Sequence, residues 1–144
     1  MQKRDKLVGF LFSDIARFRG IVFEGLMKPH GLTHAQSYVL NHLYLEDGLT
    51  QTELAKRMHI GTVTVSGLVD RLEGRGWVSR TEDKRDRRAK KVWLSQIGAD
   101  VMTHMTREFT TLNDITLDGL SEDEVIEMSR MLRKVRANLA EKVT

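Results

Sequence analysis

Hydrophobic residues recur at three- and four-residue spacing along most of the chain, and this spacing predicts a mainly α-helical protein. Pro29, the single proline, predicts that the first helix ends close to it. The stripe of that first helix consists of Leu7, Phe10, Leu11, Ile15, Phe18, Val22 and Leu26. A second helix is expected to turn Ala35, Tyr38, Val39 and Leu43 to one face.

Several helix starts are marked by a hydroxyl residue followed three positions later by Glu or Gln, the pattern of a capping box. The pairs are Thr33 with Gln36, Thr50 with Glu53, and Ser121 with Glu124. Thr62 and Ser95 are expected to cap two further helices. The helix after Thr62 is expected to end at Gly74 to Gly76 and to turn inward Val65, Leu68, Val69 and Leu72.

Two segments after this helix, 77–80 and 91–94, have the character of strands. The mostly charged residues between them predict a β-hairpin with a long tip. Two short helices around Gly61 followed by a hairpin are typical of a winged helix-turn-helix, expected over residues 33–95. The fold class is therefore mainly α with a small β-hairpin, in a single domain of residues 1–144.

The outer segments, 1–30 and 96–144, predict long helices whose apolar stripes exceed what the small middle region covers. A second copy of the chain is the simplest source of the missing surface, so these segments are expected to be dimerisation helices.

Charge is distributed unevenly over a chain whose formal net charge is only +3. Residues 50–95 hold 11 Lys and Arg against 6 Asp and Glu, a formal charge of +5. Residues 1–49 carry +1 and residues 96–144 carry −3. A basic region next to a helix-turn-helix pattern is the electrostatic signature expected of phosphate binding.

Composition excludes several classes of protein. The chain has no cysteine, which rules out disulfide scaffolds, thiolate zinc sites and thiol switches. No apolar run approaches the ~20 residues that span a bilayer, and the N-terminus is no signal peptide. We therefore expect a cytoplasmic protein with no membrane contact. No nucleophile with its base, no Gly-rich phosphate loop and no paired catalytic carboxylates are recognisable, so no enzyme is expected.

The stretch 83–89, Asp-Lys-Arg-Asp-Arg-Arg-Ala, followed by Val92, Leu94, Ser95 and Gly98, resembles the wing signature of the MarR (multiple antibiotic resistance regulator) family. The resemblance covers nearly the whole chain, because matching residues also stand at 31–33, 49–50, 54–55, 69–73, 76–78 and 120–122. It implies a transcriptional regulator that binds palindromic double-stranded DNA as a homodimer. Repression is the more frequent outcome among relatives.

The resemblance also implies roles for residues of the wing and the recognition helix. Arg88 would enter the minor groove, Arg85 and Arg87 would support it at phosphates, and Asp86 would shape the tip. Thr62, Thr64 and Ser66 match DNA-contacting positions, while the methyls of Val63 suit thymine. With Arg71 and Lys84 on the same surfaces, the expected DNA-binding residues are Thr62, Val63, Thr64, Ser66, Arg71, Lys84, Arg85, Asp86, Arg87 and Arg88. Gly61 departs from members that have an aspartate there to pair with the wing arginine.

Many relatives are released from DNA by a small aromatic acid or phenol, bound between the dimerisation helices and the winged domain. The chain offers suitable side chains on its first two helices, although such side chains more often belong to a plain core: Arg17, Phe18, Phe23, Tyr38 and His42. No motif marks the pocket, so its residues stay unassigned, and no cofactor is expected.

Two alternatives stay open. His104 and Glu108 stand four residues apart on one helix, with His42 as a third ligand facing them, which would make the protein metal-regulated. A winged helix used for protein or RNA contacts would keep the fold without needing outward hydroxyls and arginines.

Gly67 has two interpretations. A glycine inside a helix costs ~1 kcal/mol relative to alanine. Its missing side chain either lets the helix approach a DNA strand closely or lets two helices pack tightly.

Overall fold

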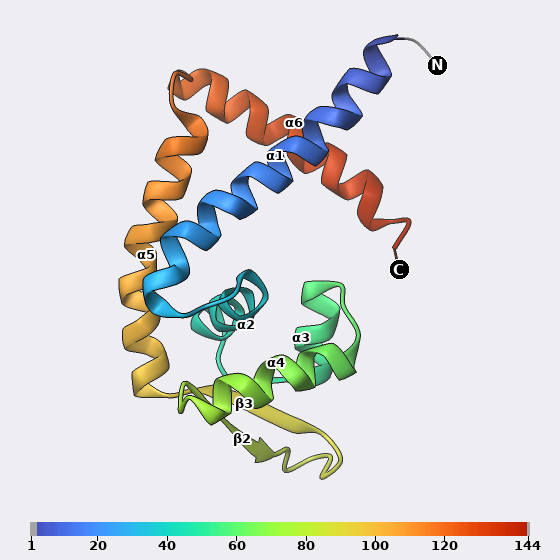
Figure 1. Cartoon of the computed structure of the whole chain (residues 1–144). Coiled ribbons are helices and arrows are strands. Elements are labelled where there is room, and N and C mark those ends of the chain that lie inside the picture. The colour runs from blue at the N-terminus through green and yellow to red at the C-terminus, as the bar shows by residue number, and fades with distance from the viewer. Residues whose placement is uncertain (1–2, 144) are drawn as a thin grey trace. The chain divides into compact units, whose positions relative to one another are not determined.

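The computed structural model describes residues 3–143, with side chains from Leu7 on. The elements are α1 (Lys3–Met27), the 3₁₀-helix η1 (Lys28–His30), α2 (His34–Leu45), β1 (Leu49–Thr50), α3 (Gln51–Met58), α4 (Thr62–Gly74), β2 (Val78–Glu82), β3 (Lys90–Leu94), α5 (Gln96–Leu117) and α6 (Glu122–Ala140) (Figure 1). Residues up to Leu112 form one compact unit, and those from Asn113 on form a second. The mainly helical fold class is confirmed.

Local capping signals account for most of the helix starts. All three expected capping boxes are present, at α2, α3 and α6. The Ser95 hydroxyl accepts a hydrogen bond from the Gly98 N–H at 3.0 Å, as expected of a cap for α5. The expected cap at Thr62 is wrong, because Gly61 is the N-cap of α4 and makes no side-chain hydrogen bond. Thr62 already lies inside the helix, and its side chain is left on the outer surface.

The core of the first unit forms where α2, α4 and the sheet meet. The expected inward face of α4, including Val65 and Val69, is buried. On α2 the expected face is partly wrong. Ala35 and Tyr38 are exposed, whereas Leu40 is fully buried. The buried face of α2 is rotated toward Gln36, Ser37 and Leu40, and Gln36 also closes the capping box.

The sheet has three antiparallel strands in the order β1-β3-β2. Val92 at the centre of β3 pairs with Arg80 on one side and Leu49 on the other. The strand β1 was not predicted, because two residues are too short to show a pattern. Asp47 supports it from outside the strand, since its carboxylate accepts hydrogen bonds from the N–H groups of Leu94 at 2.8 Å and Gly48 at 3.0 Å.

The helix α5 begins directly against the base of the hairpin. The Ser95 N–H donates to the Trp77 carbonyl at 2.9 Å, and the Ser95 hydroxyl donates to the Gly76 carbonyl at 2.7 Å. A Cβ at Gly98 would lie 2.2 Å from the Trp77 oxygen, so only glycine fits this contact. Further along, α5 buries Met102, Met105 and Leu112, and the end of α1 buries Phe23 and Met27.

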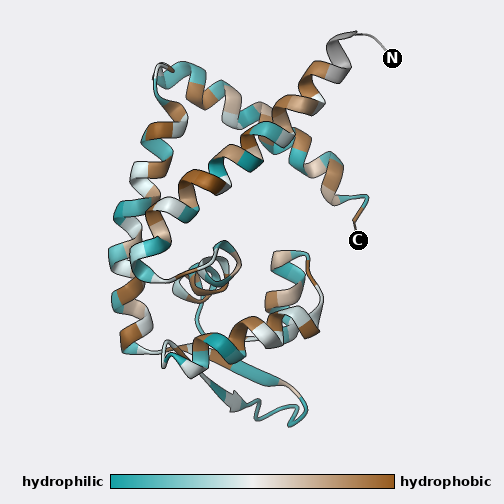
Figure 2. Cartoon of the chain, in the orientation of Figure 1, coloured by the Kyte–Doolittle hydropathy of each residue, from teal (hydrophilic) through white to brown (hydrophobic). Residues whose placement is uncertain are grey.

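Most of the apolar stripe of α1 is exposed in the single chain, and hydrophobic residues recur along the coloured part of this helix in Figure 2. The exposed side chains include Leu7, Phe10, Leu11, Ile15 and Phe18. Within the second unit, α6 likewise exposes Ile126, Met131, Leu132 and Leu139. Among the described residues, no helix is both long enough and apolar enough to cross a membrane.

Candidate nucleic-acid interface

The helices α3 and α4 form the helix-turn-helix. The helix α3 ends at Met58, and the C-cap residue His59 adopts a left-handed conformation at φ 53°. The chain then reaches Gly61 in an extended conformation and starts α4. Leu54 and Ala55 of α3 are buried against the same core as Val65 and Leu68 of α4. This packing turns the opposite face of α4 to solvent.

The outer face of α4 presents hydroxyls, one apolar side chain and one cation. Thr62, Thr64 and Arg71 are exposed, and Val63 is 85% exposed. Ser66 is half-buried, and its carbonyl accepts a hydrogen bond from Arg80 at 3.3 Å. An 85% exposed valine on an ordered helix adds nothing to the core of a single chain, which suits a surface that meets a partner.

Arg80 of β2 fastens the hairpin to α4. Its side chain is only 16% exposed, and it pairs with Asp70 and, at 3.4 Å, with Glu73. The Arg80 backbone N–H also donates to Glu73 at 3.2 Å. Sequence reasoning missed this residue, because nothing in a charged strand distinguishes the arginine that turns inward. The network holds the hairpin in a defined place beside α4.

The wing tip is shaped by two aspartates that accept hydrogen bonds from backbone N–H groups two residues later. Asp83 accepts from Arg85 at 2.7 Å, and Asp86 accepts from Arg88 at 3.0 Å. The N–H of Arg85, assisted by the charge of Lys91, holds the pKa of Asp83 below its usual value. These Asx turns give the tip a fixed backbone without a core beneath it.

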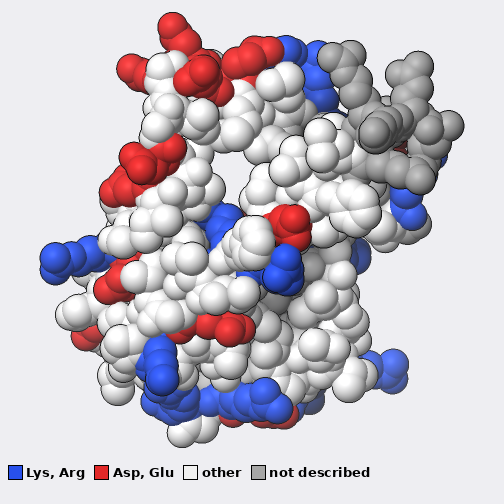
Figure 3. Space-filling model, turned by 45° about the horizontal axis from the view of Figure 1, so that its top comes forward, with Lys and Arg blue, Asp and Glu red and all other residues white. Residues whose placement is uncertain are grey.

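The tip cations all point to solvent. Lys84, Arg85, Arg87 and Arg88 are exposed, together with Asp86. In Figure 3, Lys and Arg side chains gather along the lower edge of the view. The structure thus brings the expected α4 and wing residues to neighbouring outward surfaces of the first unit.

A hollow of about 360 Å³ joins these two surfaces. It is lined by hydroxyl residues of α3, α4 and β1 and by the cations Arg80, Arg88 and Lys90. Thr52 and Lys90 were not among the expected DNA-binding residues: Thr52 lies on α3, and Lys90, expected within the hairpin tip, is the first residue of β3.

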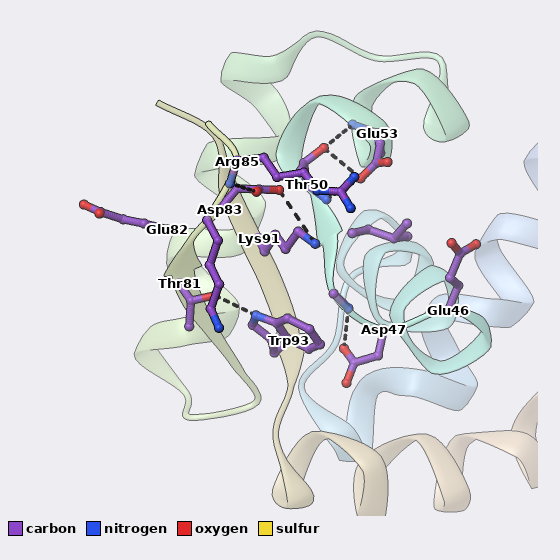
Figure 4. A pocket seen from close by; sticks show the side chains of 13 residues that line it. Glu46, Asp47, Thr50, Glu53, Thr81, Glu82, Asp83, Arg85, Lys91 and Trp93 are labelled. Carbon is purple, nitrogen blue, oxygen red and sulfur yellow. Dashed lines mark hydrogen bonds and ion pairs between the residues drawn. The ribbon is translucent and has the colours of Figure 1, made fainter. Parts of the chain in front are cut away.

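On the other side of the hairpin lies an open groove of about 710 Å³, drawn in Figure 4. Its floor is Trp93, whose indole N–H donates to the Thr81 hydroxyl at 2.8 Å. Gly48 approaches this ring so closely that a Cβ would lie 2.5 Å from it. Asp47 and Asp83 both turn toward the groove but accept hydrogen bonds from the backbone. The side chains and backbone groups that line this groove therefore contact one another and hold β1 and the wing together.

A third hollow, of about 350 Å³, is lined by aromatic and basic side chains of α1, α2 and α5. The ring centroid of Phe23 lies 5.0 Å from that of His34 and 5.7 Å from that of Phe109. Arg19 lines the same hollow. Of the five side chains that the sequence offered for a pocket, only Phe23 lines this one. Arg19, His34 and Phe109 were missed, because their convergence depends on how three helices cross.

No group of three His, Asp or Glu residues that could hold a metal ion occurs within residues 3–143. Glu108 lies 3.9 Å from His30, while His104 bonds to the Asp100 carbonyl. His42 packs against Tyr38, with ring centroids 4.8 Å apart. The three candidate ligands His42, His104 and Glu108 thus have separate surroundings.

A helix-turn-helix followed by a basic hairpin, with the outer helix face left open, defines a winged helix-turn-helix protein. The MarR family model matches residues 30–89, from the last residue of η1 to the end of the wing tip. This winged helix-turn-helix part of the chain is therefore similar to the MarR family of transcriptional regulators.

Individual proteins show the same similarity. The chain is 25% identical over 134 residues to the uncharacterized HTH-type transcriptional regulator YybA of Bacillus subtilis, which covers 88% of this chain and 89% of that protein. Among solved structures, the S. aureus MepR–DNA complex has a TM-score of 0.84 at 28% identity, covering 90% of this chain and 96% of the other. Bordetella bronchiseptica BpsR, whose DNA binding is regulated by 6-hydroxynicotinic acid, has a TM-score of 0.83 at 26% identity, covering 90% and 98%.

Proposed function

We propose that this protein is a sequence-specific DNA-binding repressor that binds a palindromic operator as a homodimer and is released by a small aromatic acid or phenol. The observation that carries the proposal is the exposed α4 face beside a basic wing of fixed shape. In this proposal the protein catalyses no reaction. It acts in the cytoplasm, where the chromosome of a bacterium or archaeon lies. The likeness to the MepR–DNA complex supports the DNA partner.

In this proposal α4 enters the major groove. Thr62 and Thr64 in its first turns contact base edges and phosphates, while Val63 packs against thymine methyls. Because Gly61 supplies no side-chain cap, the first backbone amides of α4 stay available to a phosphate. Arg71 and Ser66 lie further along the same helix.

The wing reaches the adjacent minor groove. Arg88 enters the groove, where narrow A·T-rich segments attract arginine, and Arg85, Arg87 and Lys84 bind flanking phosphates. Asp86 holds the Arg88 backbone in place through its Asx turn. The hollow between α4 and the wing is lined in part by Arg80 and Lys90. In this proposal it lies where the DNA backbone between the major and minor grooves would pass.

A second copy of the chain covers the apolar faces that one copy leaves open. Phe10 is 69% exposed and Leu7 is 63% exposed on α1. Burying such side chains yields about 1.5–3 kcal/mol each, so a row of them drives association. A two-fold dimer of helix-turn-helix units places its recognition helices about 34–36 Å apart, one turn of DNA. The proposal thus assigns DNA binding to residues 33–95 and dimerisation to residues 1–30 and 96–144, the same ranges that the sequence predicts.

The effector is proposed to bind in the hollow of Phe23, His34 and Phe109. Its aromatic walls suit a flat ring, and Arg19 and His34 suit the carboxylate of an aromatic acid. A ligand that prefers a spacing of the two recognition helices unlike the spacing on DNA competes with DNA by linkage. The regulation of BpsR by 6-hydroxynicotinic acid supports this class of ligand.

The DNA-binding proposal is tested by a titration of a duplex from the region upstream of the chain's own gene against a random duplex of equal length. We expect the wild type to prefer the upstream duplex, with an affinity that falls steeply with salt. Arg88→Ala should weaken specific binding by about 1–3 kcal/mol for each base that Arg88 recognises.

The matched control is Arg107→Ala, which removes the same charge from the exposed surface of α5. If Arg88→Ala and Arg107→Ala bind the upstream duplex equally, the wing assignment is wrong. Protein that never distinguishes the duplexes would contradict sequence-specific binding and favour a winged helix used for protein or RNA contacts.

The effector proposal is tested by calorimetry with salicylate, benzoate and hydroxynicotinate as probes. We expect heat of binding and a loss of DNA affinity, both removed by Phe109→Ala. Phe109 is only partly buried, so its truncation leaves most of the core in place. No heat and no change in DNA binding with any probe would refute a ligand switch of this type.

A further inference from the structure

We propose that Arg75 is a positioning residue that ties the C-terminal end of α4 to the corner between α1 and α2, and so sets where the recognition helix meets DNA. The inference rests on the proposed DNA binding, and it names a residue outside the expected contact set. Arg75 is the C-cap of α4, and the corner consists of η1 and Gly31.

The Arg75 guanidinium donates hydrogen bonds to this corner from two of its nitrogens. Nη1 donates to the Gly31 carbonyl at 2.5 Å, and Nη2 donates to the His30 carbonyl at 3.2 Å. These acceptors stand 44 and 45 positions away in the sequence. They lie at the C-terminal end of η1, where backbone carbonyls lack helical partners and carry partial negative charge.

The same guanidinium stacks on the chain that follows α4. Its Cζ lies 3.6 Å from the ring centroid of Trp77, which is buried at the base of the hairpin. A planar group satisfies two carbonyls in its plane and an aromatic ring on its face at once. A lysine carries the same charge but has neither the fork nor the flat face.

Gly31 makes the close approach possible. Its φ is +63°, in the left-handed region, and a Cβ there would lie 3.2 Å from Arg75 Nη2. Any larger residue would be strained and would press on the guanidinium. The close contact therefore depends both on the planar guanidinium of Arg75 and on the absence of a side chain at Gly31.

The corner also touches the helix that lines the aromatic hollow. His30 Nε2 lies 3.9 Å from Glu108 Oε1 on α5, and each side chain is 26% exposed. The next residue, Phe109, forms a wall of the hollow. A displacement of α5 or α1 by a bound ligand thus has a short physical route through the corner and Arg75 to α4.

Two variants test the inference from opposite sides. Arg75→Lys keeps the charge but loses the fork and the stacking, and Gly31→Ala changes no charge at all. In both, we expect amides of residues 28–33 and of the last turn of α4 to exchange hydrogen several-fold faster, with α6 unchanged. We also expect the ratio of affinities for upstream and random duplexes to fall by roughly 3- to 30-fold.

Affinity for the random duplex and its salt slope should stay as in the wild type, because both variants keep every cation. Gly119→Ala is the matched control for the glycine, since its φ is +81° but a Cβ there meets nothing within 4 Å. Arg107→Lys is the control for the arginine.

The inference is overturned if hydrogen exchange in both segments is unchanged in Arg75→Lys. An equal loss of affinity for both duplexes also overturns it, because Arg75 would then be a phosphate contact. The proposed DNA-binding function is judged separately, on whether the wild type prefers the upstream duplex. The exchange comparison decides the role of Arg75 in either case.

Discussion

Replacing Gly67 by alanine should make the protein more stable and at the same time a weaker DNA binder. Gly67 lies exposed in the middle of α4, between Ser66 and Leu68. A Cβ at this position meets nothing within 4 Å. Tight helix packing, one of the two interpretations of this glycine, therefore has no counterpart in the described structure. What remains is the space that the missing side chain leaves in front of the helix.

The two effects have opposite signs and separate sizes. Alanine in place of a glycine inside a helix contributes about 0.8–1.0 kcal/mol to the free energy of unfolding. At this chain length that gain raises Tm by roughly 2–4 °C. If α4 lies against DNA, the new methyl group overpacks the interface at a cost of about 1–3 kcal/mol. Specific affinity then falls by roughly 5- to 150-fold.

Urea unfolding and titration of the upstream duplex measure the two effects on one preparation. Gly25→Ala is the control, because Gly25 is also exposed within a helix, α1, and has open space around it. The control should gain stability and bind DNA as the wild type does. If Gly67→Ala lowers the stability, the space for a Cβ at Gly67 is not open. If it raises the stability and leaves the affinity for DNA unchanged, α4 does not approach DNA closely at Gly67.

Three further variants test the structure itself. Gly98→Ala should lower the free energy of unfolding by about 1–3 kcal/mol, since the new methyl meets the Trp77 carbonyl rather than a flexible side chain, and a urea midpoint equal to that of the wild type would contradict the contact. Thr50→Ala should cost about 1 kcal/mol through the loss of the α3 cap, measured by the same unfolding and absent in Thr52→Ala. Burial and then the charge of Arg57 hold the pKa of His42 below its usual value, so the unfolded chain binds the proton first. The stability of the wild type should therefore fall as pH drops below about 6.5, more steeply than that of His42→Gln, and parallel curves would assign the effect to other groups.

Features that depend on neighbouring residues could be predicted from the sequence. The capping box of Thr33 and Gln36 lies within four positions, and the inward face of α4 follows from helical periodicity alone. The wing was predictable for the same reason, because its charges and turn residues are contiguous. Thr62 was misjudged since Gly61 serves equally well as the cap, and a hydroxyl alone does not say which residue stands first.

Features that depend on distant residues could not be predicted. Arg75 reaches carbonyls 44 and 45 positions away, and Arg80 pairs with carboxylates of another element. Neither arginine differs in type from its exposed neighbours. The hollow beside Phe109 likewise arises only when three helices cross, so its chemistry follows from tertiary packing rather than from any local pattern.

The Asx turns of Asp83 and Asp86 have a consequence for how fast a complex forms. A loop that is ordered before it meets its partner loses its conformational entropy during folding rather than during binding. The backbone of Arg85 and Arg88 is already held in the free chain, so a wing that binds DNA as proposed has little conformational search left to make at the DNA surface. Association should then be governed by diffusion and by attraction between the basic tip and the phosphates, and replacing the aspartates should slow the encounter even though it makes the tip more positive.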